Sequence, residues 1–162
     1  MRRVRVIIEK DENGFSAFID GVDSTIIGEG VSVAEAKADL DNSYKEVLAS
    51  YLENGEAIPK ELQDLSFDYK YDISALFNAF DFINVSKFAQ RIGVSPSLMR
   101  HYKGGDTYIS DNQAKRIESG LHQLARELLS VTLPLEWTGW ISLQSKDSQK
   151  SSPTPQFKSI NS

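Results

Sequence analysis

The residues with the most informative spacing lie between positions 85 and 104, where the sequence reads VSKFAQRIGVSPSLMRHYKG. Two short helices that cross at a steep angle need a small residue where they touch and a tight turn between them. Ala89 is that small residue, and Gly93 follows four positions later, where the turn requires a positive φ. Six apolar residues would fill the angle between the helices: Phe88, Ile92, Val94, Leu98, Met99 and Tyr102. The pattern predicts a helix-turn-helix.

The second of these helices has a polar outer face, which in a helix-turn-helix meets the edges of bases in the major groove of DNA. The residues predicted to read bases are Ser95, Ser97, Arg100 and His101. Arg100 is the leading candidate, because a guanidinium can donate two hydrogen bonds to one guanine. The residues predicted to contact phosphates are Lys87, Gln90, Lys103 and Thr107. The alternative is an ordinary corner of a helical bundle, with these side chains as solvated surface groups.

Charge is distributed unevenly along the chain, which has a net charge of −5. Residues 1–80 hold eight basic and sixteen acidic side chains, whereas residues 81–133 hold seven basic and five acidic ones. This asymmetry suggests two domains with different partners. Because the basic excess of the second region is small, one copy should bind DNA weakly, and we expect a homodimer or higher homo-oligomer on paired half-sites of an operator.

The first 72 residues are expected to form a small sheet with one helix packed on it. Strands are predicted over residues 4–9, 15–19, 25–30 and 67–71. Asn13 and Gly14 predict a hairpin between the first two strands, because both residue types tolerate a positive φ. Ser32 and Glu35 have the spacing of a capping box, which predicts a helix that ends near Glu53. The apolar stripe of that helix comprises Ala36, Leu40, Tyr44, Val47, Leu48, Tyr51 and Leu52.

The region from residue 73 to 133 is predicted to be entirely helical. Its helices are expected over residues 74–83, 85–92, 95–103, 110–118 and 120–131, with glycines between them. Residues 134–162 contain three prolines and seven serines, and they are expected to form a mostly disordered tail. In that tail, Trp137 and Trp140 are candidates to dock on a neighbouring surface. The expected fold class is therefore α+β, with domains at 1–72 and 73–133.

Two segments of the first domain resemble a known family. Residues 26–36 (IIGEGVSVAEA) and 51–59 (YLENGEAIP) resemble the N-terminal domain of HicB-family antitoxins, which is a partial ribonuclease H-like β-β-β-α-β unit. The helical region resembles the Cro/C1 (Xre-type) repressor domain that many HicB proteins carry. The resemblance implies a type II antitoxin that blocks a HicA-like mRNA interferase through its first domain and represses its own operon through its second. The acidity of residues 1–80 suits a basic toxin, and a simple need for solubility would also explain it.

Two other functions stay open. A ribonuclease H-like fold raises the possibility of a metal-dependent nuclease, which needs several converging carboxylates. The acidic residues near the predicted strand ends form no recognisable cluster in the sequence: Glu9, Asp20, Asp23, Glu29 and Asp68. We therefore expect no catalysis. The other possibility is an orphan transcriptional regulator that has no toxin partner.

Composition excludes several further classes of protein. The chain has no cysteine, which rules out disulfides, thiol nucleophiles and Cys-ligated zinc. Its two histidines, His101 and His122, give little material for a metal site, so we expect no metal and no cofactor. No apolar run approaches the roughly 18–20 residues that cross a bilayer, and the N-terminus lacks the apolar stretch of a signal peptide. We expect a soluble cytoplasmic protein with no membrane partner.

Overall fold

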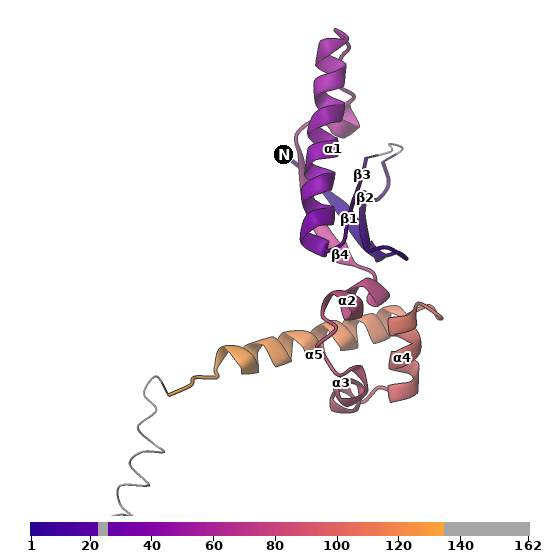
Figure 1. The fold of residues 1–162 in the computed structure, drawn as a ribbon, viewed down its shortest axis with the longest axis vertical. Helices are drawn as coiled ribbons and strands as arrows, with labels where there is room; N and C mark the ends of the chain where they lie inside the picture. Colours follow the sequence, from indigo (N-terminus) through magenta and orange to yellow (C-terminus); the bar gives the residue numbers. More distant parts are fainter. Residues whose placement is uncertain (23–25, 135–162) are drawn as a thin grey trace, which may run out of the picture. The chain divides into compact units, whose positions relative to one another are not determined.

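The computed structural model describes residues 1–22 and 26–134 and has a mixed α+β architecture (Figure 1). Its elements, in chain order, are β1 (Arg2–Lys10), β2 (Phe15–Ile19), β3 (Ile27–Gly30), α1 (Val33–Glu53), a 3₁₀ turn (Lys60–Leu62), β4 (Leu65–Tyr71), α2 (Ile73–Ala79), α3 (Val85–Ile92), α4 (Pro96–Gly104) and α5 (Asp111–Leu129). The predicted α+β class is confirmed. Trp137, Trp140 and the rest of the predicted tail beyond Pro134 lie outside the described residues.

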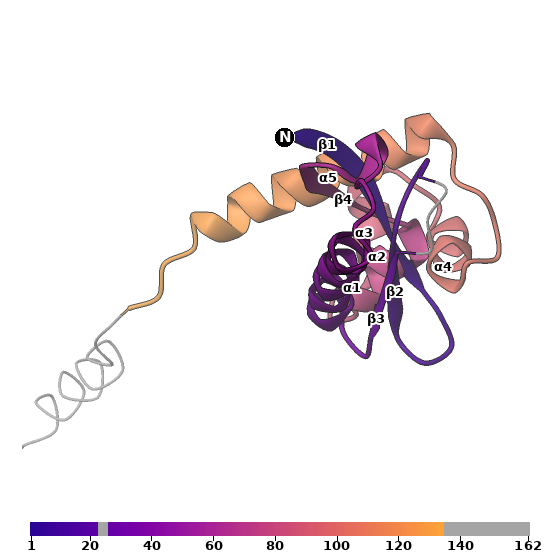
Figure 2. The same cartoon turned by 90° about the horizontal axis from the view of Figure 1, so that it is seen from above.

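The four strands form one sheet in the order β3-β2-β1-β4. β1 is antiparallel to β2 and parallel to β4, and α1 provides the crossover between β3 and β4. Alternate strand residues point to one face, where Val6, Ile8 and Ala17 are fully buried. Helix α1 covers this face and buries Ala36 and Leu40 against it (Figure 2). The core of the sheet therefore lies between one face of the strands and α1.

The predicted hairpin between β1 and β2 is confirmed, but the reason given for it is wrong. Neither Asn13 nor Gly14 has a positive φ. Instead, the carboxylate of Asp11 accepts hydrogen bonds from the backbone N–H groups of Asn13 (2.8 Å) and Gly14 (2.6 Å). Glycine is needed at position 14 because a Cβ there would collide with the carbonyl oxygen of Gly30. The side chain of Asp11 and the approach of the backbone at the end of β3 therefore define this turn.

Helix α1 begins and ends as predicted, with one correction to its buried stripe. The Ser32 hydroxyl accepts a hydrogen bond from the N–H of Glu35, and Asn54 is the C-cap. Leu52 is 68% exposed, so its predicted place in the buried stripe is wrong. The physical reason is length, because 21 helical residues span about 31 Å, well beyond the four-residue strand β3 beside them. The last turn of α1 therefore extends past the sheet (Figure 1).

The helical region differs from the prediction at two places. The helix expected over 74–83 ends at Ala79, because Phe80 leaves the helical conformation and its carbonyl accepts a turn hydrogen bond from Ile83 (3.0 Å). The two helices expected over 110–118 and 120–131 are one continuous helix, α5. Gly120 does not end a helix; it is buried within α5, where a Cβ would collide with the side chain of Ile92. The absence of a Cβ at position 120 allows α5 to lie close against α3.

Residues 1–122 form one compact unit, and a second unit starts at Gln123. The predicted division between residues 72 and 73 stays a prediction. No helix in the described part of the chain combines the length and the apolar character that a membrane span needs.

Candidate nucleic-acid interface

Helix α3 is capped at both of its ends. Asn84 caps its start, with its side-chain oxygen accepting a hydrogen bond from the N–H of Lys87 (3.0 Å). The helix ends at Gly93, which has a left-handed backbone with φ 71°. This conformation directs the N–H of Val94 to the carbonyl of Ala89 at 2.9 Å, which closes the helix end. The chain therefore reverses direction within a few residues, as the spacing of Ala89 and Gly93 predicted.

Helix α4 starts immediately after this turn and is equally short. The Ser95 hydroxyl caps it by accepting from the N–H of Leu98 (3.5 Å), and Pro96 takes the first helical position. Gly105, with φ 77°, ends it. One side of α4 is buried through Met99 and Tyr102, which are 0% and 3% exposed. The predicted start and end of this helix agree with the structure to within one residue.

Three side chains from other helices hold the α3–α4 pair in place. The hydroxyl of Ser74 and the amide of Asn78, both on α2, donate to the carbonyl of Lys103 at 2.8 and 3.2 Å. Arg116, on α5, donates from Nη1 to the carbonyl of Gly93 at 3.2 Å. Because helix-end carbonyls lack partners within their own helix, these bonds satisfy groups that would otherwise need water. They fix α4 relative to α2, and the turn relative to α5.

The outer face of α4 brings together three of the residues predicted to read bases. Ser97, Arg100 and His101 follow the i, i+3, i+4 spacing of one helical face, and all three are exposed. Arg100 reaches towards α3, where its Nη1 donates to the hydroxyl oxygen of Ser86 at 3.0 Å. The fourth residue, Ser95, is exposed but uses its hydroxyl as the helix cap. The face therefore offers a cation between two groups that can donate or accept hydrogen bonds.

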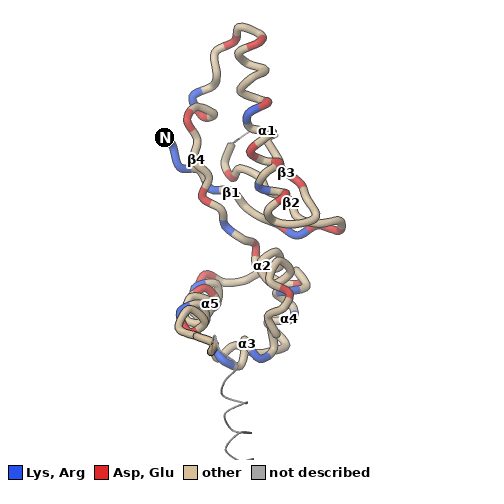
Figure 3. Tube along the Cα trace, turned by 60° about the vertical axis from the view of Figure 1, so that its left-hand side comes forward, with Lys and Arg blue, Asp and Glu red and all other residues tan. Residues whose placement is uncertain are grey.

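The four predicted phosphate contacts are placed less uniformly. Lys87 and Gln90 are exposed on α3 and lie three positions apart, on one side of that helix. Thr107 is exposed in the loop after α4, whereas Lys103 is half-buried. Asp106 also approaches this region, with Oδ2 3.5 Å from Nδ1 of His101. Lys and Arg positions fall on both α3 and α4 (Figure 3).

Two further residues belong to this surface and were missed in the sequence. Ser86 accepts a hydrogen bond from the guanidinium of Arg100. Tyr108 follows Thr107 in the loop after α4, and its side chain is fully exposed (101%). The motif spacing places Ser86 in the first turn of α3, so its position beside α4 was within reach of sequence reasoning. The exposure of Tyr108 had no sequence signal, because aromatic side chains in loops are often buried.

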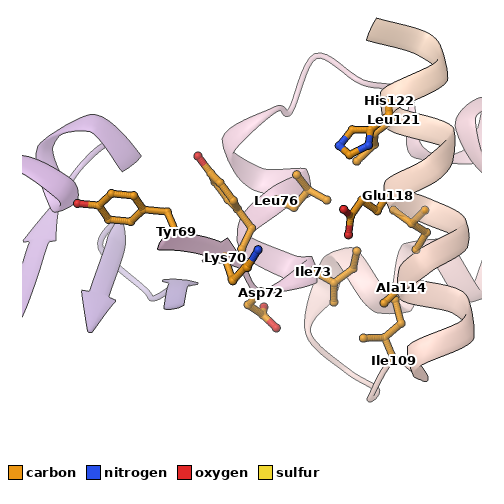
Figure 4. Close-up of a pocket in the computed structure, with 12 residues that line it drawn as sticks. Tyr69, Lys70, Asp72, Ile73, Leu76, Ile109, Ala114, Glu118, Leu121 and His122 are labelled. Carbon is orange, nitrogen blue, oxygen red and sulfur yellow. The ribbon is translucent and has the colours of Figure 1, made fainter. Parts of the chain in front are cut away.

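A separate cavity of about 420 Å³ lies among β4, α2 and α5. Ile73 and Leu76 face Glu118 and His122 across it (Figure 4). At its edge, burial, and then the negative charge of Asp41, raise the pKa of Tyr69 above its ordinary value of 10.0. A small-ligand site of this volume also needs a few converging polar groups. Among the described residues, the only buried side-chain nitrogen or oxygen without a hydrogen-bond partner is Oε1 of Gln113, which does not line the cavity. The described residues that line the cavity therefore contain no buried side-chain nitrogen or oxygen that lacks a partner and could bind a ligand.

The acidic residues considered for metal-dependent chemistry do not converge in the described part of the chain. Asp20 pairs with Arg5, and Asp68 pairs with Arg3. Glu9 and Glu29 both lie opposite Ser16, one on each neighbouring strand. Two strand spacings, about 10 Å, therefore separate them. Asp23 is outside the described residues, within which no group of three or more His, Asp or Glu is placed to hold a metal ion.

Comparison of the chain with protein-family models, with curated proteins and with solved structures finds no match.

Proposed function

We propose that this protein is a DNA-binding repressor and an antitoxin of the HicB type. In this proposal α2–α5 form a Cro/C1-type helix-turn-helix domain that binds an operator as a homodimer or higher homo-oligomer. The sheet with α1 is a partial ribonuclease H-like domain that neutralises a HicA-like mRNA interferase. The protein acts in the cytoplasm by binding and not by catalysis. One observation carries the proposal: the short, doubly capped α4, with one side buried and Ser97, Arg100 and His101 exposed on the other.

The dimensions of α4 suit the major groove. An α-helix with its side chains is about 10–12 Å in diameter and the groove is about 12 Å wide, so α4 can enter the groove with its exposed face towards the base edges. The bonds from Ser74, Asn78 and Arg116 tie α4 to α2 and the turn to α5. A rigid recognition element loses less conformational entropy on binding. These features favour DNA binding over an ordinary helical corner. In an ordinary corner, the outer face of the second helix would not need to be held in a fixed orientation.

The antitoxin part of the proposal rests on two observations. Residues 26–36 and 51–59 resemble HicB-family antitoxins, and residues 1–80 are acidic. Residues 1–80 hold sixteen acidic and eight basic side chains, which favours a cationic partner. An mRNA-cleaving toxin binds a polyanion and therefore presents a basic surface. An orphan regulator without a toxin is the alternative, and it would keep the DNA-binding part of the proposal unchanged.

The proposal is tested by fluorescence anisotropy of a labelled duplex that carries the DNA upstream of this protein's own reading frame. Full-length wild type, Arg100→Ala and Lys45→Ala are titrated against this duplex and against a shuffled duplex. Lys45→Ala is the matched control, because it removes one exposed positive charge from α1, which carries none of the candidate contacts. Loss of a guanine contact in Arg100→Ala should cost about 1–3 kcal/mol on the upstream duplex and relax discrimination at one base position.

Two results would contradict the DNA-binding part. The first is equal affinity of the wild type for the upstream and shuffled duplexes. The second is equal affinity of Arg100→Ala and Lys45→Ala for the upstream duplex, because a general charge effect would then explain the loss. Cleavage of either duplex in the presence of Mg²⁺ would instead favour the nuclease alternative.

A further inference from the structure

Strand β4 forms one edge of the sheet, and only one side of its backbone is bonded to β1. The N–H of Arg2 donates to the carbonyl of Asp64 at 2.7 Å, and the N–H of Asp72 donates to the carbonyl of Ile8 at 2.9 Å. Successive residues of a strand turn their backbone groups to opposite sides. The even-numbered residues of β4 therefore bond to β1. The residues whose N–H and C=O groups point away from the sheet are Leu65, Phe67, Tyr69 and Tyr71.

Only the first of these four residues has a partner on the outer side. The N–H of Leu65 donates to the hydroxyl of Tyr44 at 3.3 Å. Within the part of the chain that the structure describes, the outward backbone groups of Phe67, Tyr69 and Tyr71 have no hydrogen-bond partner. A row of unpaired N–H and C=O groups of this kind is a template for another strand.

The side chains of the same three residues also point to a missing neighbour. Their register partners on β1, which face α1, are Val4, Val6 and Ile8. These partners are at most 6% exposed, whereas the three aromatic side chains of β4 are only half-buried. Residues 69–71 also border the cavity of about 420 Å³, where Figure 4 shows Tyr69 and Lys70. Unfilled space therefore lies beside this part of the strand.

We propose that residues 67–71 of β4 pair with the same residues of a second copy of this chain, antiparallel about a two-fold axis at Tyr69. Tyr69 then lies opposite Tyr69 of the second copy, and Phe67 lies opposite its Tyr71. Each of these pairs exchanges two hydrogen bonds, so every free backbone group of the three residues acquires a partner. The inference deepens the homodimer of the proposed function, because it assigns the surface that joins the two copies.

The charges on β4 are self-complementary in this register. Asp68 lies opposite Lys70 of the second copy, at a position where the two Cα atoms of a strand pair are about 4.5 Å apart. Within one chain, Asp68 is already 3.5 Å from Lys70 and 3.2 Å from Arg3. The aspartates and lysines of the two copies would thus alternate in sign around the axis. On the α1 side, Lys37 lies 4.4 Å from the ring centre of Tyr69, and Asp41 brings a negative charge near the same ring.

Other antiparallel registers of the two strands fit less well. An axis at Asp68 would place the two Asp68 carboxylates directly opposite each other, which is destabilising. An axis at Phe67 would place Tyr69 opposite Leu65, whose N–H is already bonded to Tyr44. A strand from an unrelated protein would need its own matching charges, whereas a second copy supplies them by symmetry. Charge and hydrogen bonding together select the second copy as the occupant of this edge.

Sedimentation equilibrium of the full-length protein over a concentration series tests the proposal. The wild type should reach twice the 18.1 kDa mass of one chain. Lys70→Glu and Asp68→Lys each place like charges opposite each other twice, so each should weaken dimerisation by on the order of tenfold or more. The matched controls Lys45→Glu and Glu46→Lys, at exposed positions on α1, should change it by less than about threefold. A monomeric wild type, or equal losses in variants and controls, would overturn the proposal.

An equimolar mixture of Lys70→Glu and Asp68→Lys gives the sharpest test. In a mixed dimer the introduced glutamate faces the introduced lysine, and the native Asp68 faces the native Lys70. The mixture should therefore dimerise nearly as tightly as the wild type, although each variant alone does not. Circular dichroism shows that both variants are folded. A mixture of folded variants that stays monomeric would overturn the proposal.

The register is measured by pulsed electron spin resonance. The chain has no cysteine, so Ser66→Cys provides a single attachment site for a nitroxide label. An axis at Tyr69 places the two Cα atoms of residue 66 about 21 Å apart, against about 14 Å for an axis at Asp68 and about 8 Å for one at Phe67. Either shorter separation would overturn the assigned register.

These experiments fail separately from the proposed function. A monomeric wild type that still prefers the upstream duplex would contradict the edge pairing and leave DNA binding intact. A dimer with the expected register but no duplex preference would do the reverse. If both hold, Lys70→Glu should bind the upstream duplex more weakly than the wild type, because two linked domains bind paired half-sites more tightly than one. Addition of Asp68→Lys should then restore the affinity.

Discussion

The guanidinium of Arg100 donates from Nη1 to the hydroxyl oxygen of Ser86 at 3.0 Å, which joins the outer face of α4 to the first turn of α3. An exposed arginine normally samples many rotamers, and ordering it costs side-chain entropy. The hydrogen bond to Ser86 restricts the side chain of Arg100 in the free protein, so less side-chain entropy is lost when DNA binds. The remaining guanidinium N–H groups stay available to a base edge, because Ser86 accepts from only one nitrogen.

The contact with Ser86 predicts a specific effect of Ser86→Ala. This variant should leave the free energy of unfolding within about 0.5 kcal/mol of the wild type, because the bond is solvent-exposed. Its binding to the upstream duplex should weaken by about 0.5–1.5 kcal/mol, since Arg100 loses one positioning hydrogen bond. Urea denaturation and fluorescence anisotropy measure the two quantities. Unchanged duplex affinity in Ser86→Ala would show that the contact does not prepare Arg100 for DNA.

Lys87 and Arg100 should differ in how salt affects their contributions. A lysine on a phosphate releases about one counterion, so Lys87→Ala should reduce the slope of log affinity against log salt by about one and weaken all sequences alike. Arg100→Ala should instead reduce discrimination between duplexes. Anisotropy at a series of KCl concentrations, with Lys45→Ala as the control, separates these outcomes. A sequence-dependent loss in Lys87→Ala would assign this lysine to a base and not to a phosphate.

Gly120→Ala should destabilise the helical region even though alanine favours helix. The added Cβ would collide with Ile92 and lie 3.3 Å from Cζ of Phe88. Overpacking of this kind costs about 1–3 kcal/mol, against a gain in helix propensity of about 1 kcal/mol. Urea denaturation of Gly120→Ala and of the exposed control Ser119→Ala tests the balance. Combining Gly120→Ala with Ile92→Ala should relieve the collision, and strictly additive losses in the double variant would rule it out.

Gly93→Ala should cost stability through the backbone alone. A Cβ at this position has no atom within 4 Å, so no steric contact is added. The left-handed φ of 71° costs a residue with a Cβ roughly 1–2 kcal/mol. Asparagine tolerates this conformation better than alanine does, so Gly93→Asn should be the more stable of the two variants by thermal or urea unfolding. The reverse order would mean that the turn does not depend on the conformation of residue 93.

Local signals predicted the parts of the fold that depend on neighbouring residues. The cap Ser32 and the left-handed turn at Gly93 involve atoms at most a few positions apart in the chain, so the sequence contains all that defines them. The shared face of Ser97, Arg100 and His101 was predictable for the same reason, because helical spacing determines it.

The predictions were wrong where a residue that is distant in the sequence determines the local structure. Gly120 resembles a helix breaker until Ile92 is seen to pack against it. Gly14 resembles a residue with a positive φ, but it is required by the carbonyl of Gly30.

Sequence-specific DNA binding through α4 can be measured directly by selecting duplexes from a random library with the full-length protein. Binding through α4 predicts enrichment of a motif with two half-sites whose centres lie about one helical turn of DNA apart, or a multiple of it. It also predicts that Arg100→Ala selects a motif that has lost preference for guanine at one position in each half-site. A final pool indistinguishable from the starting library, at salt concentrations where the protein still binds DNA, would contradict the claim.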